Sequence, residues 1–248
     1  TDCSEHSNYT FTIELPLSNE TSVNKTKHCC RLFTFLTGNT LASISGLIPR
    51  RLYSSLGRSL ALLDLQLNST YNIPHLTKFV PQNNASVGVE KCWNMLFADE
   101  VLQERAKYIQ RDEDKQLVNA VLSSIDFKLL KNQNVTEYCW IHNDANDHNV
   151  LILDANDLVK DVVPLGLIDF GDVTYAPIVF EATIASAYCI MNEYNDHRML
   201  SVICWVLQGF HSVKEFREVD LDLLFPLVKL RLALSVTNSS FLERHELQ

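Results

Sequence analysis

Glycine is scarce and widely spaced in this chain, and this limits the folds open to it. Only seven glycines occur among 248 residues, whereas an average protein contains about 7% glycine. Their positions spell neither G-x-G-x-x-G nor G-x-x-x-x-G-K-[ST], the loops in which glycine permits positive φ and close approach of the backbone to phosphate. A Rossmann or P-loop phosphate cradle within these residues is therefore excluded.

The composition is that of an ordinary globular protein, with 46% hydrophobic and 21% charged residues. The formal net charge of −9 argues against a nucleic-acid partner, because phosphate recognition needs clustered Lys and Arg. The sequence shows no basic and apolar leader and no apolar stretch of membrane-spanning length. Seven cysteines without a C-x-x-C pair favour reduced thiols. We therefore expect a cytoplasmic protein with no nucleic-acid and no membrane partner.

Two runs near the start of the sequence predict strands. Residues 9–15 alternate between apolar and polar side chains, and residues 29–36 (CCRLFTFL) have the apolar, aromatic character of a buried strand. Two strands alone are only marginally stable. We therefore expect these to be the last strands of a sheet whose earlier strands are absent from this sequence.

The rest of the chain has mostly helical patterning. Leucines recur at spacings of three and four from Leu52 to Leu67, which predicts a helix that begins near Pro49. Further helices are expected over residues 90–109, 115–130, 179–191, 200–210 and 221–241. Short strands are expected over residues 138–141, 150–153 and 162–168, the last two joined through an Asx-rich turn at 154–157. The predicted fold class is α+β, mostly helical with a small β-hairpin.

Polar residues flank that hairpin in two groups. His142, Asp144 and Asn149 precede its first strand, and Asp169 follows its last. Carboxylate and amide oxygens that converge at strand ends suit Mg²⁺, which also takes water and substrate phosphates as ligands. A carboxylate that the metal does not need can accept a proton from a substrate hydroxyl. The pattern therefore favours phosphoryl transfer, in which an Asp, an Asn and an Asp before Phe-Gly play these parts.

Other interpretations of these residues stay open. Asp144 and Asn149 suit an Asx-rich turn that bonds its own backbone. His142, Asp144 and His148 are possible zinc ligands, although no further histidine cluster completes such a site. An EF-hand loop beginning at Asp144 would lack its sixth-position Gly and twelfth-position Glu. An ordinary core strand is the alternative interpretation of the aromatic run at residues 29–36.

The string IHNDANDHNVLI, followed by LGLIDFGDVTY and VFEATIA, resembles the aminoglycoside phosphotransferase and choline-kinase-like superfamily, and within it most closely the hydroxylysine kinases. The string RLFTFLTG is similar to the hinge strand between the two lobes of that superfamily. The resemblance runs from about residue 9 to the end of the chain. It implies a protein-kinase-like fold, with a remnant of the nucleotide-binding lobe over residues 1–36 and a helical catalytic lobe over residues 37–248.

The resemblance also implies roles for individual residues of the polar loop. Asp144 would be the general base or the carboxylate that orients the substrate hydroxyl, and His142 would brace the loop. Asn149 and Asp169 would hold Mg²⁺ that bridges the nucleotide phosphates. Asn143 stands where the superfamily usually has glycine, so a positive φ there would strain the loop, although Asn tolerates this conformation better than most residues.

For the hinge, the resemblance places the backbone groups of Thr34 and Leu36 against the purine, with Phe33 behind it. Asp172 and Glu181 follow an acidic pattern near the substrate side and receive no definite role. The glycine-rich cover and the strand lysine of the nucleotide lobe are missing, and Lys25 and Lys27 are poor substitutes. We therefore expect the missing lobe segment upstream, and we expect this chain alone to phosphorylate nothing.

The implied activity is transfer of the γ-phosphoryl group of ATP or GTP to the hydroxyl of a small amino alcohol or hydroxylated amino acid, with Mg²⁺. Resemblance to the hydroxylysine kinases suggests 5-hydroxylysine as the acceptor. A choline, homoserine or aminoglycoside-type kinase is the alternative within the class. The rival from another class is a truncated or degenerate kinase-like module that binds without catalysis.

Overall fold

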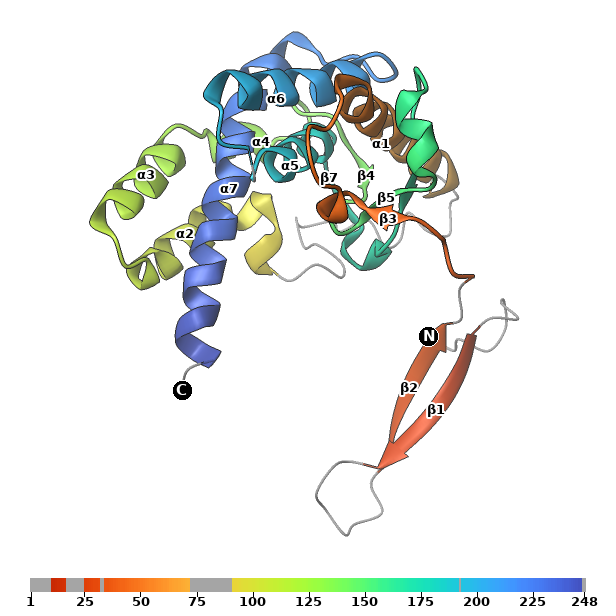
Figure 1. Ribbon diagram of the computed structural model, residues 1–248. Helices are drawn as coiled ribbons and strands as arrows, with labels where there is room; N and C mark the ends of the chain where they lie inside the picture. The colour runs from red at the N-terminus through yellow and green to blue at the C-terminus, as the bar shows by residue number, and fades with distance from the viewer. Residues whose placement is uncertain (1–9, 17–24, 32–33, 72–90, 192, 247–248) are drawn as a thin grey trace. The chain divides into compact units, whose positions relative to one another are not determined.

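The computed structural model describes residues 10–16, 25–31, 34–71, 91–191 and 193–246 (Figure 1). The chain divides into two compact units, Thr1–Thr37 and Gly38–Gln248. The assignment of residues 1–36 to a nucleotide lobe and of residues 37–248 to a catalytic lobe stays a prediction.

The first unit contains a pair of antiparallel strands. Strand β1 (Thr10–Pro16) pairs with β2 (Lys25–Arg31), with Ile13 opposite His28. The first predicted strand is confirmed, but the second was placed four residues too late and extended too far. Among the described residues β2 pairs only with β1, and Phe35 is 90% exposed. Residues 34–36 therefore do not form the buried strand that their composition predicted.

The second unit holds two small antiparallel sheets. In one, β3 (Asn39–Thr40), β5 (Val150–Ile152) and β6 (Leu165–Leu167) lie in the order β3-β5-β6. In the other, β4 (Tyr138–Ile141) pairs with β7 (Thr174–Pro177). The predicted hairpin is confirmed as β5–β6, although β6 is shorter than expected. The sequence analysis missed β3 and β7, which are too short to show an alternating pattern.

Helices make up most of the second unit, and Figure 1 shows them around the small sheets. The predicted helix after Pro49 and the three C-terminal helices are confirmed. The predicted helix over residues 90–109 is wrong in detail, because it breaks into short 3₁₀ turns around one α-helix. The helix over residues 115–130 is split where the Asp126 side chain accepts hydrogen bonds from Lys128 and Leu129 and starts a new helix. The α-helices are α1 (Arg50–Tyr71), α2 (Ala98–Arg105), α3 (Asp112–Ser123), α4 (Phe127–Leu130), α5 (Val179–Ile190), α6 (Asp196–His211) and α7 (Glu218–Glu246).

Helix α5 lies at the centre of the core, packed against α6 and α7, and nine successive residues from Val179 to Ala187 are buried. Helices α1 and α6 cross at a pair of glycines. A Cβ atom at Gly57 would lie 1.9 Å from the Val206 carbonyl oxygen, and one at Gly209 would lie 1.9 Å from the Ser54 carbonyl oxygen. Two of the few glycines therefore serve helix packing, because no side chain fits at this crossing.

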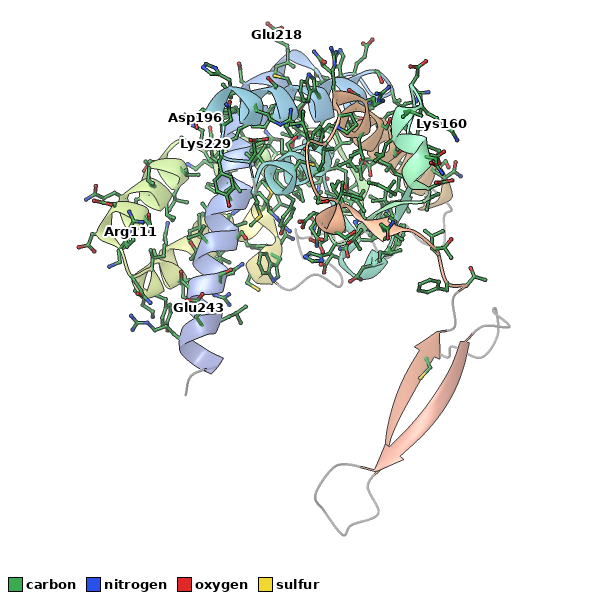
Figure 2. The ribbon with its side chains drawn as sticks, viewed as in Figure 1. Arg111, Lys160, Asp196, Glu218, Lys229 and Glu243 are labelled. Carbon is green, nitrogen blue, oxygen red and sulfur yellow. The ribbon has the colours of Figure 1, made fainter. Side chains whose placement is uncertain are left out.

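The surface of the helical unit carries charged side chains, and Figure 2 shows Arg111, Glu218 and Glu243 directed outward. Across the described ranges, no helix combines the length and the apolar character that a bilayer crossing requires. Five cysteines in those ranges are free thiols, namely Cys30, Cys92, Cys139, Cys189 and Cys204.

Candidate active site

The imidazole of His142 links the polar loop to the end of β6. Its Nδ1 accepts a hydrogen bond from the Asp144 N–H at 3.3 Å, and its Nε2 lies 3.0 Å from the Ile168 carbonyl oxygen. Because Nδ1 accepts and the carbonyl can only accept, the proton of the neutral ring lies on Nε2. The ring is fully buried and meets Phe170 edge to face at 4.8 Å. This geometry suits the predicted bracing role and leaves neither nitrogen free for a substrate.

The backbone of Asn143 has a positive φ of 66°, the conformation for which the superfamily's glycine is suited. Its N–H donates to the Glu181 Oε2 at 3.0 Å. Glu181 is fully buried on α5, and its Oε1 finds no partner among the described residues. Burial raises the pKa of the Glu181 carboxyl, whereas His142 and the loop N–H groups lower it. Glu181, to which the sequence analysis assigned no definite role, therefore stabilises the strained turn by accepting the hydrogen bond of the Asn143 N–H.

Both carboxylate oxygens of Asp144 are engaged. Oδ2 accepts from the side-chain amides of Asn146 at 2.9 Å and Asn149 at 2.8 Å. Oδ1 lies 3.3 Å from Nη2 of Arg231. Three donors, one of them charged, fix the carboxylate in one orientation. The side chain keeps 18% of its surface exposed, so a small molecule can reach it.

Asn149 is oriented by the same network. Its Nδ2 donates to the carboxylate of Asp144 and, at 2.9 Å, to the Asp144 carbonyl oxygen. Its own carbonyl oxygen accepts from the Ile168 N–H at 3.1 Å, which joins the loop to β6. Because the amide nitrogen is used twice, Oδ1 is the side-chain atom left to act as a ligand.

Asp169 has a left-handed backbone, with φ 62° and ψ 72°. Its Oδ1 accepts from the Gly171 N–H at 3.3 Å, and the residue is exposed. Asn143 and Asp169 are the only non-glycine residues with positive φ in the described part of the chain. Such strain costs about 1–3 kcal/mol per residue and concentrates at functional sites. Both strained residues lie in the two groups that the sequence singled out.

A third carboxylate faces the same space. Burial raises the pKa of Asp172, the charges of Asp144 and Asp169 raise it further, and Arg231 lowers it. Asp172 therefore shares an electrostatic environment with both predicted site carboxylates. Three carboxylates and the Arg231 guanidinium thus influence one another in this region.

The donors in this region fit Mg²⁺. Asn149 and Asp169 offer oxygen atoms only, and Mg²⁺ is usually held by one or two carboxylates, with water and substrate phosphates as its other ligands. Over the ranges that the structure describes, no three His, Cys, Asp or Glu side chains are grouped to hold a metal by themselves. The zinc interpretation therefore has no complete ligand set there.

Arg231 is a site residue that the sequence analysis missed. It lies on α7, only 2% exposed. Its Nη1 donates to the Trp93 carbonyl oxygen at 2.9 Å and its Nη2 to the Tyr188 hydroxyl at 3.0 Å. The guanidinium lies 5.4 Å from the Trp93 ring centroid and 5.2 Å from that of Tyr188. The available signal was a lone arginine in the apolar string LVKLRLALS of the last helix.

The predicted nucleotide contacts belong to the first unit. Thr34 and Leu36 are exposed there, and Phe33 lies outside the described residues. Their contact with a purine stays a prediction, as do the roles of Asp144, His142, Asn149 and Asp169.

Comparison with known proteins agrees with the resemblance seen in the sequence. A hydroxylysine kinase of Xenopus laevis is 28% identical over 218 residues, which cover 87% of this chain and 55% of that protein. A hydroxylysine kinase of Bos taurus is 28% identical over 213 residues, which cover 85% and 53%. The chain spans about half the length of these relatives.

Among solved structures, the AMP-bound complex of the spectinomycin phosphotransferase APH(9)-Ia is similar in fold. The TM-score is 0.51, with 86% of this chain and 65% of that chain covered at 15% identity. This likeness confirms the α+β, protein-kinase-like fold class. The profile of the family described as "Phosphotransferase enzyme family" matches residues 13–215, which is most of the sequence. The chain therefore belongs to the phosphotransferase enzyme family.

Proposed function

We propose that this chain is the catalytic part of a small-molecule kinase that transfers the γ-phosphoryl group of ATP or GTP to a substrate hydroxyl. The observation that carries the proposal is the setting of Asp144. Its carboxylate is held by three donors, remains partly exposed, and lies in a loop whose strained turn is fixed from behind by Glu181.

Phosphoryl transfer depends mainly on positioning and on stabilisation of charge. The donors around Asp144 fix the orientation of its carboxylate, so it is suited to accept a hydrogen bond from a substrate hydroxyl. His142 contacts the Asp144 N–H through one ring nitrogen and the Ile168 carbonyl oxygen, just after β6, through the other. Asp144 therefore orients the attacking oxygen, and His142 positions Asp144.

Asn149 and Asp169 would hold Mg²⁺ through their free oxygen atoms. When bound, this ion neutralises charge on the nucleotide phosphates. The nucleotide base would contact the backbone of Thr34 and Leu36 and the ring of Phe33. The AMP in the similar spectinomycin phosphotransferase structure supports a nucleotide donor, with either ATP or GTP as the triphosphate.

The hydroxylysine kinases that match this chain support 5-hydroxylysine as the acceptor. Choline, homoserine and aminoglycosides are the alternative acceptors within the class. A cytoplasmic location agrees with free thiols in the described residues.

The test is substitution of Asp144 in the full-length protein that carries this chain. Asp144→Asn keeps the size of the side chain but weakens acceptance of the hydroxyl proton, so we expect kcat to fall by about 100-fold or more while nucleotide binding stays measurable. Asp222→Asn removes an exposed carboxylate on α7 and is the matched control. Turnover by Asp144→Asn equal to that of Asp222→Asn would contradict the proposed role.

A further inference from the structure

Two acidic side chains in the core of the second unit lack hydrogen-bond donors. Asp64 on α1 and Glu181 on α5 are both fully buried. Neither carboxyl oxygen of Asp64 has a partner among the described residues, and the same is true of Oε1 of Glu181. Burial of an ionised carboxylate without a donor is so unfavourable that such a group binds a proton instead. These three oxygens therefore need a proton that the surrounding groups do not supply.

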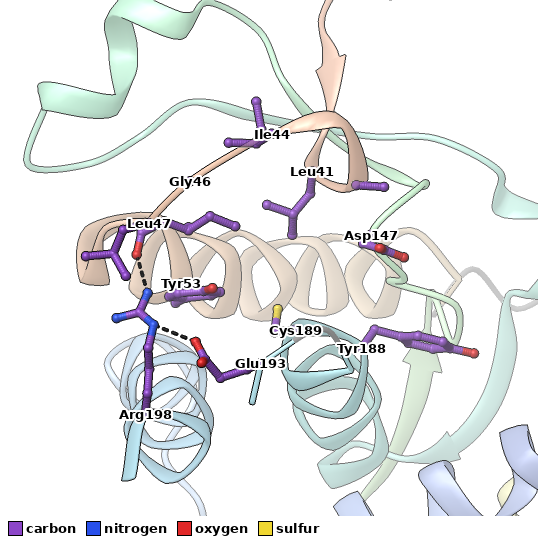
Figure 3. A pocket seen from close by; sticks show the side chains of 12 residues that line it. Leu41, Ile44, Gly46, Leu47, Tyr53, Asp147, Tyr188, Cys189, Glu193 and Arg198 are labelled. Carbon is purple, nitrogen blue, oxygen red and sulfur yellow. Dashed lines mark hydrogen bonds and ion pairs between the residues drawn. The ribbon is translucent and has the colours of Figure 1, made fainter. Parts of the chain in front are cut away.

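Helix packing and electrostatics place the two carboxyl groups in one region. Helix α1 packs against α5 and β4, and Figure 3 shows Tyr53 of α1 and Cys189 of α5 on the wall of one cavity. Burial raises the pKa of Asp64, and the charge of Glu181 raises it further. Burial and then the charges of Asp64 and Glu181 raise the pKa of the Cys139 thiol on β4. Each carboxyl group is therefore close enough to influence the other.

Two carboxylates in one buried region cannot both stay ionised, because each raises the pKa of the other. The donors around them decide which one keeps the charge. Oε2 of Glu181 accepts a hydrogen bond from the Asn143 N–H at 3.0 Å, whereas no described group donates to Asp64. The negative charge is therefore better stabilised on Glu181, and the proton is better placed on Asp64.

The other titratable groups nearby leave this assignment unchanged. From β4, the Cys139 thiol faces the pair and stays neutral because of its raised pKa. Burial raises the pKa of Glu181, His142 lowers it, and the charge of Asp144 raises it. Helix α6 also packs against α1, but within the described ranges Glu181 is the one charge that acts on the pKa of Asp64. Burial and Glu181 therefore determine whether Asp64 keeps its proton.

We propose that Asp64 is a positioning residue whose protonated carboxyl donates a hydrogen bond to Oε1 of Glu181 and thereby stabilises the turn that presents Asp144. The Asp64 O–H supplies the donor that Oε1 lacks, while Oε2 keeps the Asn143 N–H. Loss of the proton from Asp64 would leave two like charges in one buried region and weaken the hold of Glu181 on the turn. The effect on turnover rests on the proposed phosphoryl transfer, whereas the shared proton does not.

The first test detects the proton by infrared difference spectroscopy of the full-length protein. At about pH 6 an ordinary Asp is ionised, but wild type should show a protonated carboxyl that Asp64→Asn lacks. Asp222→Asn, at an exposed position on α7, should keep this absorption. Glu181→Gln removes the neighbouring charge, so the absorption should disappear at a pH lower by about one unit or more. A wild-type spectrum without a protonated Asp64 would overturn the proposal, and so would an unchanged midpoint in Glu181→Gln.

The second test separates positioning from ordinary stability. Asp64→Leu removes the donor, so we expect kcat to fall by about 10–100-fold, with each KM changed by less than about threefold. Asp64→Asn keeps a donor that does not ionise. It should retain kcat within about threefold of wild type and lose the alkaline decline that wild type and Asp222→Asn share. Identical kcat–pH profiles for Asp64→Asn and wild type would overturn the proposal, even if Asp64→Leu does not fold.

This proposal and the proposed function fail in different ways. If no alcohol is phosphorylated, the proposed function fails, while an infrared band of Asp64 that responds to Glu181→Gln still supports the shared proton. If alcohols are phosphorylated but Asp64 is ionised at about pH 6, the kinase stands and the shared proton does not.

Discussion

The polar loop at residues 142–149 and the hinge segment at residues 34–37 contrast in how their groups are held. In the loop, His142, Asp144 and Asn149 are joined by hydrogen bonds of 2.8–3.3 Å, and two of the three are buried. In the hinge segment, the described residues are exposed, with Phe35 at 90%. Hydrogen bonds within the second unit thus hold the groups that we propose to act on the acceptor. The described residues that we propose to contact the nucleotide belong to the first unit and are exposed.

The contrast predicts that damage to the loop network is costly and damage to the hinge segment is not. The largest effect on stability should come from Arg231→Met, which removes the charged partner of Asp144 and the donor to the Tyr188 hydroxyl. Breaking a buried ion pair from one side costs about 3–5 kcal/mol, and urea unfolding measures this loss. Arg231→Lys should recover part of it. A loss below about 0.5 kcal/mol, the size of an ordinary surface substitution, would show that Asp144 is not held in this way.

A smaller effect is expected at the strained turn. Asn143→Val places a β-branched residue at φ 66° and should lower stability by about 1–3 kcal/mol, with a matching loss of turnover. Asn143→Gly is the paired variant, because glycine adopts this conformation without strain. It should be at least as stable as wild type by urea unfolding. Equal stability of the Val and Gly variants would mean that the turn is not strained.

The buried carboxyl of Asp64 on α1 should make the stability of the second unit depend on pH. It is fully buried, its carboxylate oxygens have no partner among the described residues, and burial, followed by Glu181, raises its pKa well above the usual value. A raised pKa means that the folded protein keeps a proton that the unfolded chain releases near pH 4. Protonated Asp64 therefore contributes fully to the free energy of unfolding below about pH 4. This contribution is lost as the pH rises toward the pKa of Asp64 in the folded protein.

Asp64→Asn removes this loss, so its stability relative to wild type should improve steadily from pH 4.5 to pH 8 in urea unfolding. Asp222→Asn, at an exposed position, should show no such trend. A difference between Asp64→Asn and wild type that stays constant with pH would contradict a protonated Asp64.

The smallest effect is expected in the hinge segment. Leu36 is 41% exposed, so Leu36→Ala should change the unfolding free energy by no more than about 0.5 kcal/mol. Any change in the Kd for ATP or GTP should appear without a change in stability. If Leu36→Ala lowered the unfolding free energy by several kcal/mol, the hinge segment would be as important for stability as the polar loop, contrary to this account.

Local patterns in the sequence predicted much of this structure. The periodic leucines of α1 and the apolar run of α5 marked their helices because amphipathic or buried helices show in consecutive residues. Asp144, Asn149 and Asp169 were predicted as site residues for the same reason, since their short spacing and the hairpin between them are local features.

The features that were missed depend on long-range contacts. Arg231 lies 87 residues from Asp144, so no spacing rule connects them. Strand β7 forms only because β4 offers it a partner, and the register of β2 is set by β1 rather than by its aromatic neighbours. The use of Gly57 and Gly209 at the α1–α6 crossing likewise depends on tertiary packing.

The central claim is that this chain carries the phosphoryl-transfer site of a kinase for small hydroxylated amines. Mass spectrometry of reactions of the full-length protein with ATP or GTP, Mg²⁺ and a panel of 5-hydroxylysine, choline, homoserine and an aminoglycoside tests it most directly. We predict one phosphorylated product, 5-phosphohydroxylysine, formed in equal amount to the nucleoside diphosphate and absent with Asp144→Asn. Nucleotide binding without any phosphorylated product, or product formation that Asp144→Asn leaves unchanged, would contradict the account.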